Sequence, residues 1–264
     1  MKLDVLMSCM NQENDALVKK SCIVGNLVVI NQCRRDGEWI IENASGRIRW
    51  IDSTTKGLSV SRNLAILASD ADVCLLCDDD EVFDADYEQK ILDAYSQLPD
   101  ADVIAFKMID HAPSFPDRVI RLRFPKTMKV SSVQMSFRRK SVIDSGVFFD
   151  EDLGAGTGNG AEEELKFLTD CEKAGLKIYY VPEEIASFSQ DHSTWFSGFD
   201  ETFFYNRGAT TRYILGYPLA LLYACYYIIR KRALYRSQIS SFCAMKALLR
   251  GMWDNKISKK KRKQ

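Results

Sequence analysis

The chain has 264 residues, which is long enough for one large domain or two small ones with a core that needs no disulfide or metal. It carries 36 basic against 36 acidic side chains, and this balance argues against a dedicated nucleic-acid-binding protein. The distribution is uneven, because the segment from Arg230 to Gln264 contains twelve Lys or Arg and a single acid, Asp254. A basic end on an acidic body is typical of a protein that touches an anionic surface, although a solvated, disordered tail has the same composition.

The cysteines and the apolar segments indicate the compartment. Five cysteines lie in or beside apolar runs, where a free thiol behaves as a small hydrophobic residue; they are Cys9, Cys22, Cys33, Cys74 and Cys77. We expect reduced core residues in a cytosolic protein. Cys74 and Cys77 have zinc-like spacing, but residues three apart on a strand face opposite sides and no second pair follows, which does not favour zinc. Polar residues from Asn11 onward leave no room for a signal peptide, so we expect no export.

The expected elements, taken in chain order, favour a parallel sheet with crossover helices, because the opening reads as strand, helix and strand. They are a strand over Leu3–Met10, a helix over Asp15–Ile23, strands over Asn26–Asn31 and Arg47–Ile51, a helix over Gly57–Ser69, a strand over Val73–Cys77, a helix over Asp86–Gln97, strands over Asp102–Lys107 and Ser132–Arg138, a helix over Ala161–Ala174 and a strand over Ile178–Val181. We expect Pro182 to end the last strand and the first domain to end near Arg212.

An uninterrupted acidic run, Asp78-Asp79-Asp80, directly follows the strand expected over Val73–Cys77. Open α/β sheets bind their ligands at the carboxyl ends of their strands, so position and chemistry agree. Adjacent carboxylates repel one another unless a cation compensates. Hard oxygen ligands in small number suit Mg²⁺ or Mn²⁺ shared with substrate phosphates. The run therefore predicts a metal site that neutralises a departing diphosphate.

At this point the sequence resembles a known family. The segment Gly57-Leu-Ser-Val-Ser-Arg-Asn63, followed by Leu75-Leu-Cys-Asp-Asp-Asp80, is similar to the paired signature of family 2 glycosyltransferases. The resemblance continues through Gly154-Ala-Gly-Thr-Gly-Asn-Gly-Ala-Glu-Glu-Glu164, Phe167 and Gly175-Leu-Lys-Ile-Tyr-Tyr-Val-Pro182. It covers residues 1 to 192 and implies the type-A fold, a single Rossmann-like, mostly parallel sheet flanked by helices. Residues 1–212 would form the nucleotide-sugar-binding catalytic domain, and residues 213–264 a helical, basic appendage.

The resemblance also implies roles for residues on the donor side. Asp78 would contact the nucleotide ribose, Asp80 would bind the metal, and Arg62 would lie against the base or the diphosphate. Asp79 could replace either acid, because a triple run leaves the register open. In this fold the ends of the first two strands contact the base, which implies contacts from Asn11, within Met10–Gln12, and from Asn31 or Gln32. The family often has an acid at that second position, and this chain has none. His192 stands where many type-A enzymes supply a last metal ligand, and a surface or packing role is the alternative.

On the acceptor side, the resemblance implies that Glu163 and Glu164 form the acidic pair opening a helix, with Glu164 as the general base of an inverting transfer. A glutamate has more reach than the aspartate frequent there, so the two acids could exchange roles. The structural alternative is that Glu162 to Glu164 only complement a helix N-terminus. The glycine-rich segment Gly154–Gly160 lacks the ending of a phosphate loop, so we interpret it as an acceptor loop that orders with substrate.

The C-terminal segment combines an apolar stretch with a cluster of cations. The apolar stretch Tyr217–Ile229 is shorter than the roughly 20 residues that span a bilayer. With Arg230-Lys231-Arg232 after it, it predicts an interfacial helix on an anionic membrane, or else a helix packed on the catalytic domain or on a second copy in a homo-oligomer.

The leading hypothesis is a metal-dependent inverting transferase that moves a sugar from a UDP-sugar to a saccharide or lipid-linked acceptor. It would act in cell-envelope polysaccharide synthesis at the cytoplasmic membrane face, with no nucleic-acid partner. A sugar nucleotidyltransferase is the second enzyme reading, but it would need a basic glycine-rich loop that Ser8–Gln12 does not supply. A non-catalytic binding module of the same fold is the third, and the intact acids argue against it.

Overall fold

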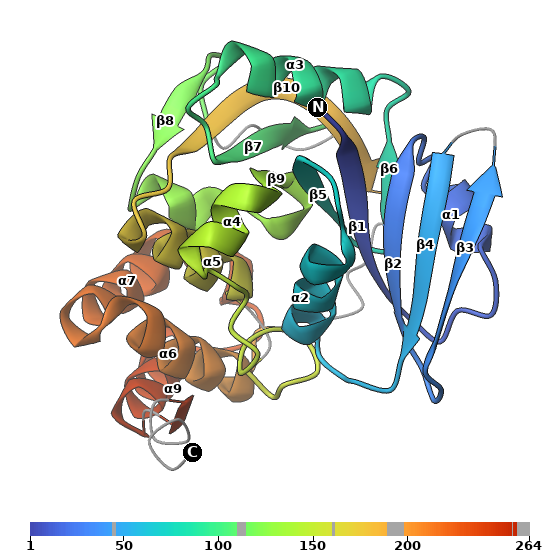
Figure 1. Cartoon of the computed structure of the whole chain (residues 1–264). Coiled ribbons are helices and arrows are strands. Elements are labelled where there is room, and N and C mark those ends of the chain that lie inside the picture. The colour runs from blue at the N-terminus through green and yellow to red at the C-terminus, as the bar shows by residue number, and fades with distance from the viewer. Residues whose placement is uncertain (44–45, 110–114, 160–161, 189–197, 255, 258–264) are drawn as a thin grey trace. The chain divides into compact units, whose positions relative to one another are not determined.

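The computed structural model describes residues 1–43, 46–109, 115–159, 162–188, 198–254 and 256–257 (Figure 1). The chain forms two compact units. The first comprises Met1–Asp150 and Glu164–Asp191, and the second comprises Glu151–Glu163 and His192–Gln264. The boundary expected at residue 212 lies inside the second unit, and the segment expected as the acceptor loop belongs to that same unit.

The first unit is built on a ten-stranded sheet with the order β3-β4-β2-β1-β5-β9-β7-β10-β6, and β8 pairs with β10. Its strands are β1 (Leu3–Met10), β2 (Asn26–Gln32), β3 (Gly37–Asn43), β4 (Gly46–Ser53), β5 (Val73–Cys77), β6 (Glu81–Phe83), β7 (Val103–Met108), β8 (Ile120–Leu122), β9 (Met135–Arg138) and β10 (Ile178–Phe188). The strands β4, β2, β1 and β5 are parallel, and so are β7 and β10. Because β9 is antiparallel to both β5 and β7, the two groups point the same way. The expected mostly parallel sheet is confirmed.

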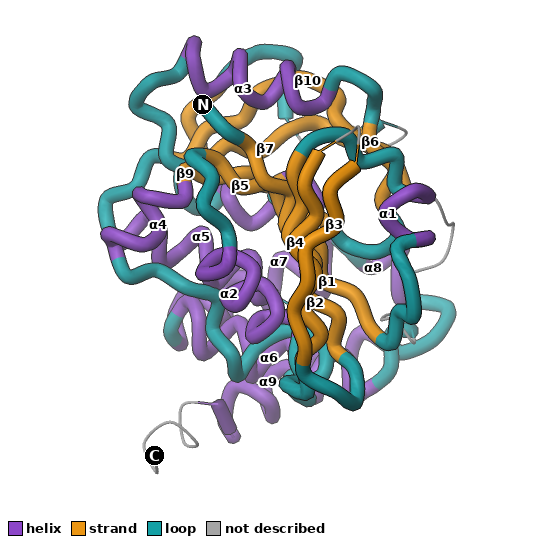
Figure 2. Tube along the Cα trace, turned by 45° about the vertical axis from the view of Figure 1, so that its right-hand side comes forward, coloured by secondary structure: helices purple, strands orange, loops and turns teal. Residues whose placement is uncertain are grey.

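Helices cover both faces of this sheet, as Figure 2 shows for α1 on one side and α2 with α4 on the other. The helices of the unit are α1 (Ala16–Lys20), α2 (Leu58–Ala68), α3 (Tyr87–Gln97), α4 (Arg139–Ser145) and α5 (Glu163–Lys173), with short 3-10 turns η1 (Lys126–Lys129) and η2 (Ser132–Gln134). Val5 of β1 shares one hydrophobic cluster with Ile91 of α3, whereas the next residue, Leu6, shares the other with Ile66 of α2. Successive strand residues point to opposite faces, and both faces are covered, so the strands read as continuous apolar runs.

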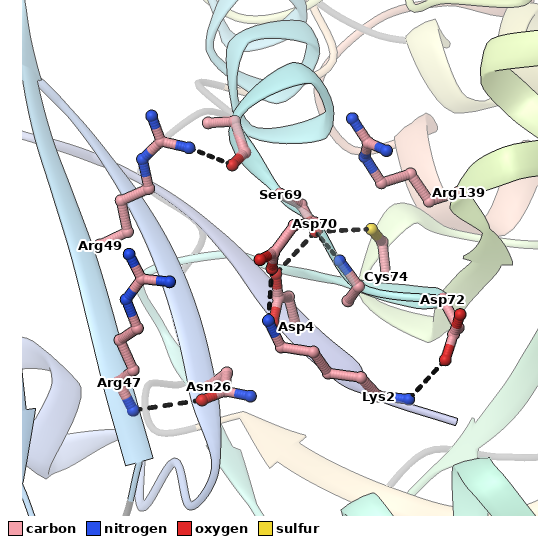
Figure 3. Close-up of polar contacts among 12 residues, drawn as sticks. Lys2, Asp4, Asn26, Arg47, Arg49, Ser69, Asp70, Asp72, Cys74 and Arg139 are labelled. Carbon is pink, nitrogen blue, oxygen red and sulfur yellow. Dashed lines mark hydrogen bonds and ion pairs between the residues drawn. The ribbon is translucent and has the colours of Figure 1, made fainter.

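A buried polar contact fixes the end of α2 against the first strand (Figure 3). Asp4 of β1 is only 3% exposed, and its Oδ2 accepts a hydrogen bond of 2.7 Å from the hydroxyl of Ser69, the residue that follows α2. The Cys74 thiol of β5 lies 3.5 Å from the same hydroxyl. Since a buried carboxylate needs a partner, this contact favours one placement of α2 on the sheet.

The last strand differs from the expectation. We expected Pro182 to end it, but β10 continues to Phe188. Its pairing with β7 changes register between Tyr180 and Glu184, and this irregularity accommodates a residue that has no N–H to donate. The continuation pairs with β6, so that Phe188 lies opposite Glu81.

Smaller corrections concern α1 and the cysteines. The helix expected over Asp15–Ile23 is confined to Ala16–Lys20. The eight cysteines, all within the described residues, are free thiols. Of the five expected in the core, Cys22 is exposed and Cys33 half-buried, because both lie in turns beside the strands rather than within them.

The second unit is helical, as expected for the C-terminal part. Its helices are α6 (Glu201–Leu215), α7 (Tyr217–Arg230), α8 (Arg232–Tyr235) and α9 (Ser241–Asp254). Glycines bring α6 and α9 close together: a Cβ added to Gly208 would lie 2.1 Å from the carbonyl oxygen of Leu248, and one added to Gly251 would lie 2.0 Å from that of Tyr205. Aromatic and small side chains fill the core around Phe204, Tyr227 and Tyr235. In the part of the chain that the structure describes, no helix is long and apolar enough to span a bilayer.

Candidate active site

Polar residues follow neighbouring parallel strands at the carboxyl edge of the sheet. Asn11 follows β1, Asn31 lies at the end of β2, Asp52 at the end of β4, and Asp78 directly after β5. The strand pairing brings Met10 level with Gln32 and Asn31 level with Asp52. The structure therefore gathers the predicted donor residues at one edge, where open α/β sheets hold ligands.

Asn31 is the centre of a buried network on this edge. Its side chain accepts from the backbone N–H of Gln12 at 2.9 Å and donates to the carbonyl of Gln12 at 2.9 Å and to Asp52 Oδ1 at 2.7 Å. Asp52 also accepts from the Trp50 indole and pairs with Arg35. Burial alone would raise the pKa of Asp52, but the hydrogen bonds from Arg35, Trp50 and Asn31 outweigh it and lower the pKa. The Asn31 amide thus holds the segment after β1, and its contact with a donor base stays a prediction.

Asn11 adopts a left-handed backbone, with φ of 50°, and its side chain is exposed. Its N–H donates to the carbonyl of Gln32 at 3.1 Å, which ties the turn after β1 to the end of β2. Asparagine tolerates this conformation better than most residues. Asn11 is therefore placed at the edge where the base was expected, with its side chain open to solvent.

The acidic run forms the turn between β5 and β6. Asp79 is exposed, and Asp78 and Asp80 are half-buried. Burial and the charge of Asp78 raise the pKa of Asp79, and burial with the charges of Asp78 and Asp79 raises the pKa of Asp80. The Asp78 N–H donates to Oε2 of Glu81 at 3.1 Å, and Glu81 is 1% exposed. Mutual repulsion of this kind is what a bound cation would relieve.

Arg62 of α2 is the basic partner of this turn. Its side chain is 1% exposed, and Nη2 donates to Asp78 Oδ1 at 2.9 Å. The guanidinium also lies over the ring of Phe149, 5.4 Å from its centroid. Arg62 and Asp78, both expected on the donor side, form a direct ion pair, and a contact of either with the donor stays a prediction.

The ring of Phe149 contacts both the guanidinium of Arg62 and Phe167 of helix α5. Its ring stacks on Phe167 of α5, with centroids 4.4 Å apart and planes inclined by 7°. The side chain of Asn63 holds the backbone of Phe149, accepting from its N–H and donating to its carbonyl, both at 2.9 Å. Because residues three apart on a helix share a face, Phe167 supports the turn of α5 that carries Glu164. Asn63, Phe149 and Phe167 thus form a packed cluster one helical turn from the predicted base.

The acidic pair opens α5 as expected, and its two members differ in exposure. Glu163 is 6% exposed, whereas Glu164 is half-buried. Glu162 before them has a left-handed backbone with φ of 73°. The greater accessibility of Glu164 favours it over Glu163 as the group that could reach an acceptor hydroxyl, and both roles stay predictions.

The acidic turn offers the oxygen donors that the predicted cation prefers. Carboxylate oxygens from Asp78 to Asp80 suit Mg²⁺ or Mn²⁺. Burial and the neighbouring carboxylates raise the pKa values of Asp79 and Asp80, and a bound cation would compensate these charges. Among the described residues, no group of three or more His, Cys, Asp or Glu side chains is arranged to hold a cation. Substrate phosphates would have to complete the coordination. His192, the other predicted ligand, lies outside the described residues.

Sequence reasoning missed Asp52 and Phe149. Asp52 is the acid that seemed to be lacking beside Asn31, and it comes from the neighbouring strand β4 rather than from β2. The sequence did contain a signal for Asp52, because this acid directly follows the strand expected over Arg47–Ile51. Phe149 had no such signal, since its role depends on contacts with residues far away in the sequence.

Comparisons with known proteins agree with this geometry. The family model described as glycosyl transferase family 2 matches residues 22–150, a range that includes α2 and the acidic turn. The chain is similar to the solved structure of S. aureus TarS 1-349 in complex with UDP-GlcNAc, with a TM-score of 0.59 and 16% identity over 90% of this chain and 74% of that one. The complex of TarS 1-349 with UDP gives a TM-score of 0.54 at 16% identity and the same coverage. A further TarS structure gives 0.57 at 14% identity, covering 90% of this chain and 44% of that one.

A search of curated proteins finds no significant match. At these identities, the likeness to TarS shows the fold, and the family model adds the enzyme class. The nucleotidyltransferase reading is thereby set aside. Residues 22–150 thus match glycosyl transferase family 2, and the chain has the type-A fold of the TarS structures.

Proposed function

We propose that the chain is a metal-dependent inverting transferase that moves a sugar from a UDP-sugar to a saccharide or lipid-linked saccharide in cell-envelope polysaccharide synthesis. The acidic turn Asp78–Asp80, paired with Arg62 at the carboxyl edge of the sheet, is the observation that carries the proposal. UDP and UDP-GlcNAc are the ligands of the similar TarS structures, which supports a uridine diphosphate donor here.

The proposed roles are those that the family resemblance implies, and the ion pair of Arg62 with Asp78 supports them. Arg62 holds Asp78 toward the ribose, and Asp80, with His192, would hold Mn²⁺ or Mg²⁺. The ion would supply charge neutralisation of the diphosphate leaving group. Asn11, with the backbone that Asn31 fixes, would line the base.

The transfer itself needs a base on the acceptor side. Glu164 accepts the proton of the acceptor hydroxyl, and the hydroxyl oxygen forms a bond to the anomeric carbon of the sugar. The bond from that carbon to the diphosphate oxygen breaks, the diphosphate leaves with its electron pair, and the anomeric configuration inverts. Glu163, more deeply buried, would orient its neighbour.

The test measures UDP release from a panel of UDP-sugars with Mn²⁺, with water as the acceptor where no saccharide is known. We expect Glu164→Gln to lower turnover by on the order of 10² to 10⁴ while UDP affinity stays within about twofold. Glu163→Gln is the matched control and should lose less. Full turnover in Glu164→Gln would show that another group is the base.

We also propose that α7 binds an anionic membrane surface and so places the enzyme at the inner face of the cell membrane. Exposed apolar side chains repeat along one stripe of α7, at Leu219, Leu222, Tyr226 and Ile229. Arg230, Lys231 and Arg232 follow, and no Asp or Glu occurs from Thr202 to Trp253. An apolar stripe with flanking cations and no acids is suited to lipid head groups of negative charge.

Because α7 shares a hydrophobic core with α6 and α9, point substitutions test this proposal better than removal of the segment. We expect Leu222→Glu to reduce cosedimentation with vesicles containing phosphatidylglycerol and to leave thermal stability unchanged, since Leu222 is 66% exposed. Val24→Glu, at an exposed apolar residue of the first unit, is the control. Unchanged vesicle binding, or loss of a dimer in place of vesicle binding, would contradict the membrane proposal.

A further inference from the structure

The side chain of Arg207 in α6 is held by aromatic rings, a hydroxyl and a carboxylate, and the mechanism above does not use it. Its guanidinium lies over two rings, 4.9 Å from the centroid of Phe203 and 4.7 Å from that of Tyr227. Nη1 donates to the Tyr223 hydroxyl at 2.7 Å, and Nη2 pairs with a carboxylate oxygen of Glu162 at 3.2 Å. The side chains of Arg207 and Glu162 are 18% and 10% exposed. All of these residues belong to the second compact unit.

The aromatic contacts give this pair a fixed geometry. A planar guanidinium stacked on rings loses little freedom when it also donates hydrogen bonds, unlike a lysine ammonium. A buried ion pair contributes little net stability, but removal of one partner leaves an uncompensated buried charge. Burial lowers the pKa of Arg207, but Glu162, Tyr223 and Tyr227 together outweigh it and raise the pKa, so the guanidinium stays charged. The side chain of Glu162 is therefore held at Arg207 of α6.

The anchored residue also has an unusual backbone. Glu162 has φ of 73°, a conformation that residues with a side chain rarely adopt unless their surroundings enforce it. It directly precedes α5, so its backbone angles set the direction in which the chain enters the turn with Glu163 and Glu164. A relaxed Glu162 would reorient that turn.

We infer that Arg207 is a positioning residue that holds Glu162 in its left-handed conformation and thereby orients the acidic pair at the start of α5. The functional part of this inference rests on the proposed role of Glu164. The helical unit would then have a second task besides membrane binding. The same unit binds the expected acceptor loop, where Lys256 Nζ lies 3.0 Å from Asn206 Oδ1 of α6 and 3.4 Å from the carbonyl of Gly158.

The first readout does not depend on activity. In Arg207→Met, hydrogen–deuterium exchange of the peptide covering residues 163–169 should become faster, because the entry to α5 loosens. Arg212→Met is the matched control, since Arg212 also lies on α6 and stacks on a ring, that of Tyr217 at 4.7 Å. Glu162→Gln, which keeps the side-chain volume and a hydrogen bond, serves if Arg207→Met fails to fold. Unchanged exchange in both variants would overturn the inference.

The second readout is kinetic. With a UDP-sugar donor, we expect Arg207→Met to lower kcat by about 10- to 100-fold, as small misplacements of catalytic groups do, with the Kd for UDP unchanged. Because both residues act as one unit, the variant that combines Arg207→Met with Glu162→Gln should lose no more than Arg207→Met alone. Faster exchange with kcat unchanged would overturn the functional part of the inference. If Glu164→Gln also keeps full turnover, the proposed base fails as well, and faster exchange would still show that Arg207 orders α5.

Discussion

Asn63 offers a direct test of the packed cluster that it forms with Phe149 and Phe167. It is 7% exposed, and it satisfies both the N–H and the carbonyl of Phe149 with hydrogen bonds of 2.9 Å. Asn63→Ala leaves these two backbone groups unpaired in the core. Each buried group without a partner costs about 1–3 kcal/mol, so we expect the free energy of unfolding to fall by about 2–6 kcal/mol.

The assay is urea unfolding followed by circular dichroism. With a slope of about 3 kcal/mol/M, a loss of that size lowers the midpoint by roughly 1 M. Leu67→Ala is the control, because Leu67 lies on the same helix and is 57% exposed. Exposed substitutions stay within about 0.5 kcal/mol. If the Asn63→Ala midpoint matched that of Leu67→Ala, the Phe149 backbone would have found other partners and our reasoning about this cluster would fail.

Three further outcomes follow from the structure. Gly251→Ala should lower the thermal midpoint despite the better helix propensity of alanine, because its Cβ would lie 2.0 Å from the carbonyl oxygen of Tyr205 and overpacking costs about 1–3 kcal/mol; an unchanged midpoint would show that α6 and α9 separate easily. Without divalent cations, stability should increase as the pH falls from neutral toward the raised pKa values of Asp79 and Asp80, because the native state then binds more protons than the unfolded one. This gain should be smaller in Asp80→Asn, and an equal gain would assign it to other groups. A thiol reagent at pH 8 should modify exposed Cys22 and spare Cys74, since burial raises the pKa of Cys74 to about 12; rapid loss of the Cys74 thiol would mean that β5 opens locally.

The sheet and the donor side could be predicted because their signals are local. Val73–Cys77 is a continuous buried run, and the acids that follow it have no structural reason to be adjacent. The family signature that includes Arg62 is likewise contiguous in the sequence, and the structure pairs this residue with Asp78. Each of these features depends on residues close together in the chain.

The features that were missed depend on tertiary contacts. Pro182 is a poor strand residue by itself, and only the register change against β7 makes it acceptable in β10. The left-handed backbone of Glu162 has no signal in its own sequence, because the partner that accompanies it, Arg207, is on α6. The C-terminal helices were expected to form an appendage by themselves. The segment Glu151–Glu163 is separated from them in the sequence, and that it belongs to the same compact unit is visible only in the folded chain.

The most direct test of the account is calorimetric titration of UDP into the protein with Mn²⁺ and with EDTA, for the wild type, Asp80→Ala and the exposed-acid control Asp93→Ala. We predict that UDP binds the wild type and Asp93→Ala only with Mn²⁺, and that Asp80→Ala loses this binding. Equal UDP affinity with and without Mn²⁺ in the wild type would contradict the role of the acidic turn, and the absence of UDP binding under both conditions would contradict the proposed donor.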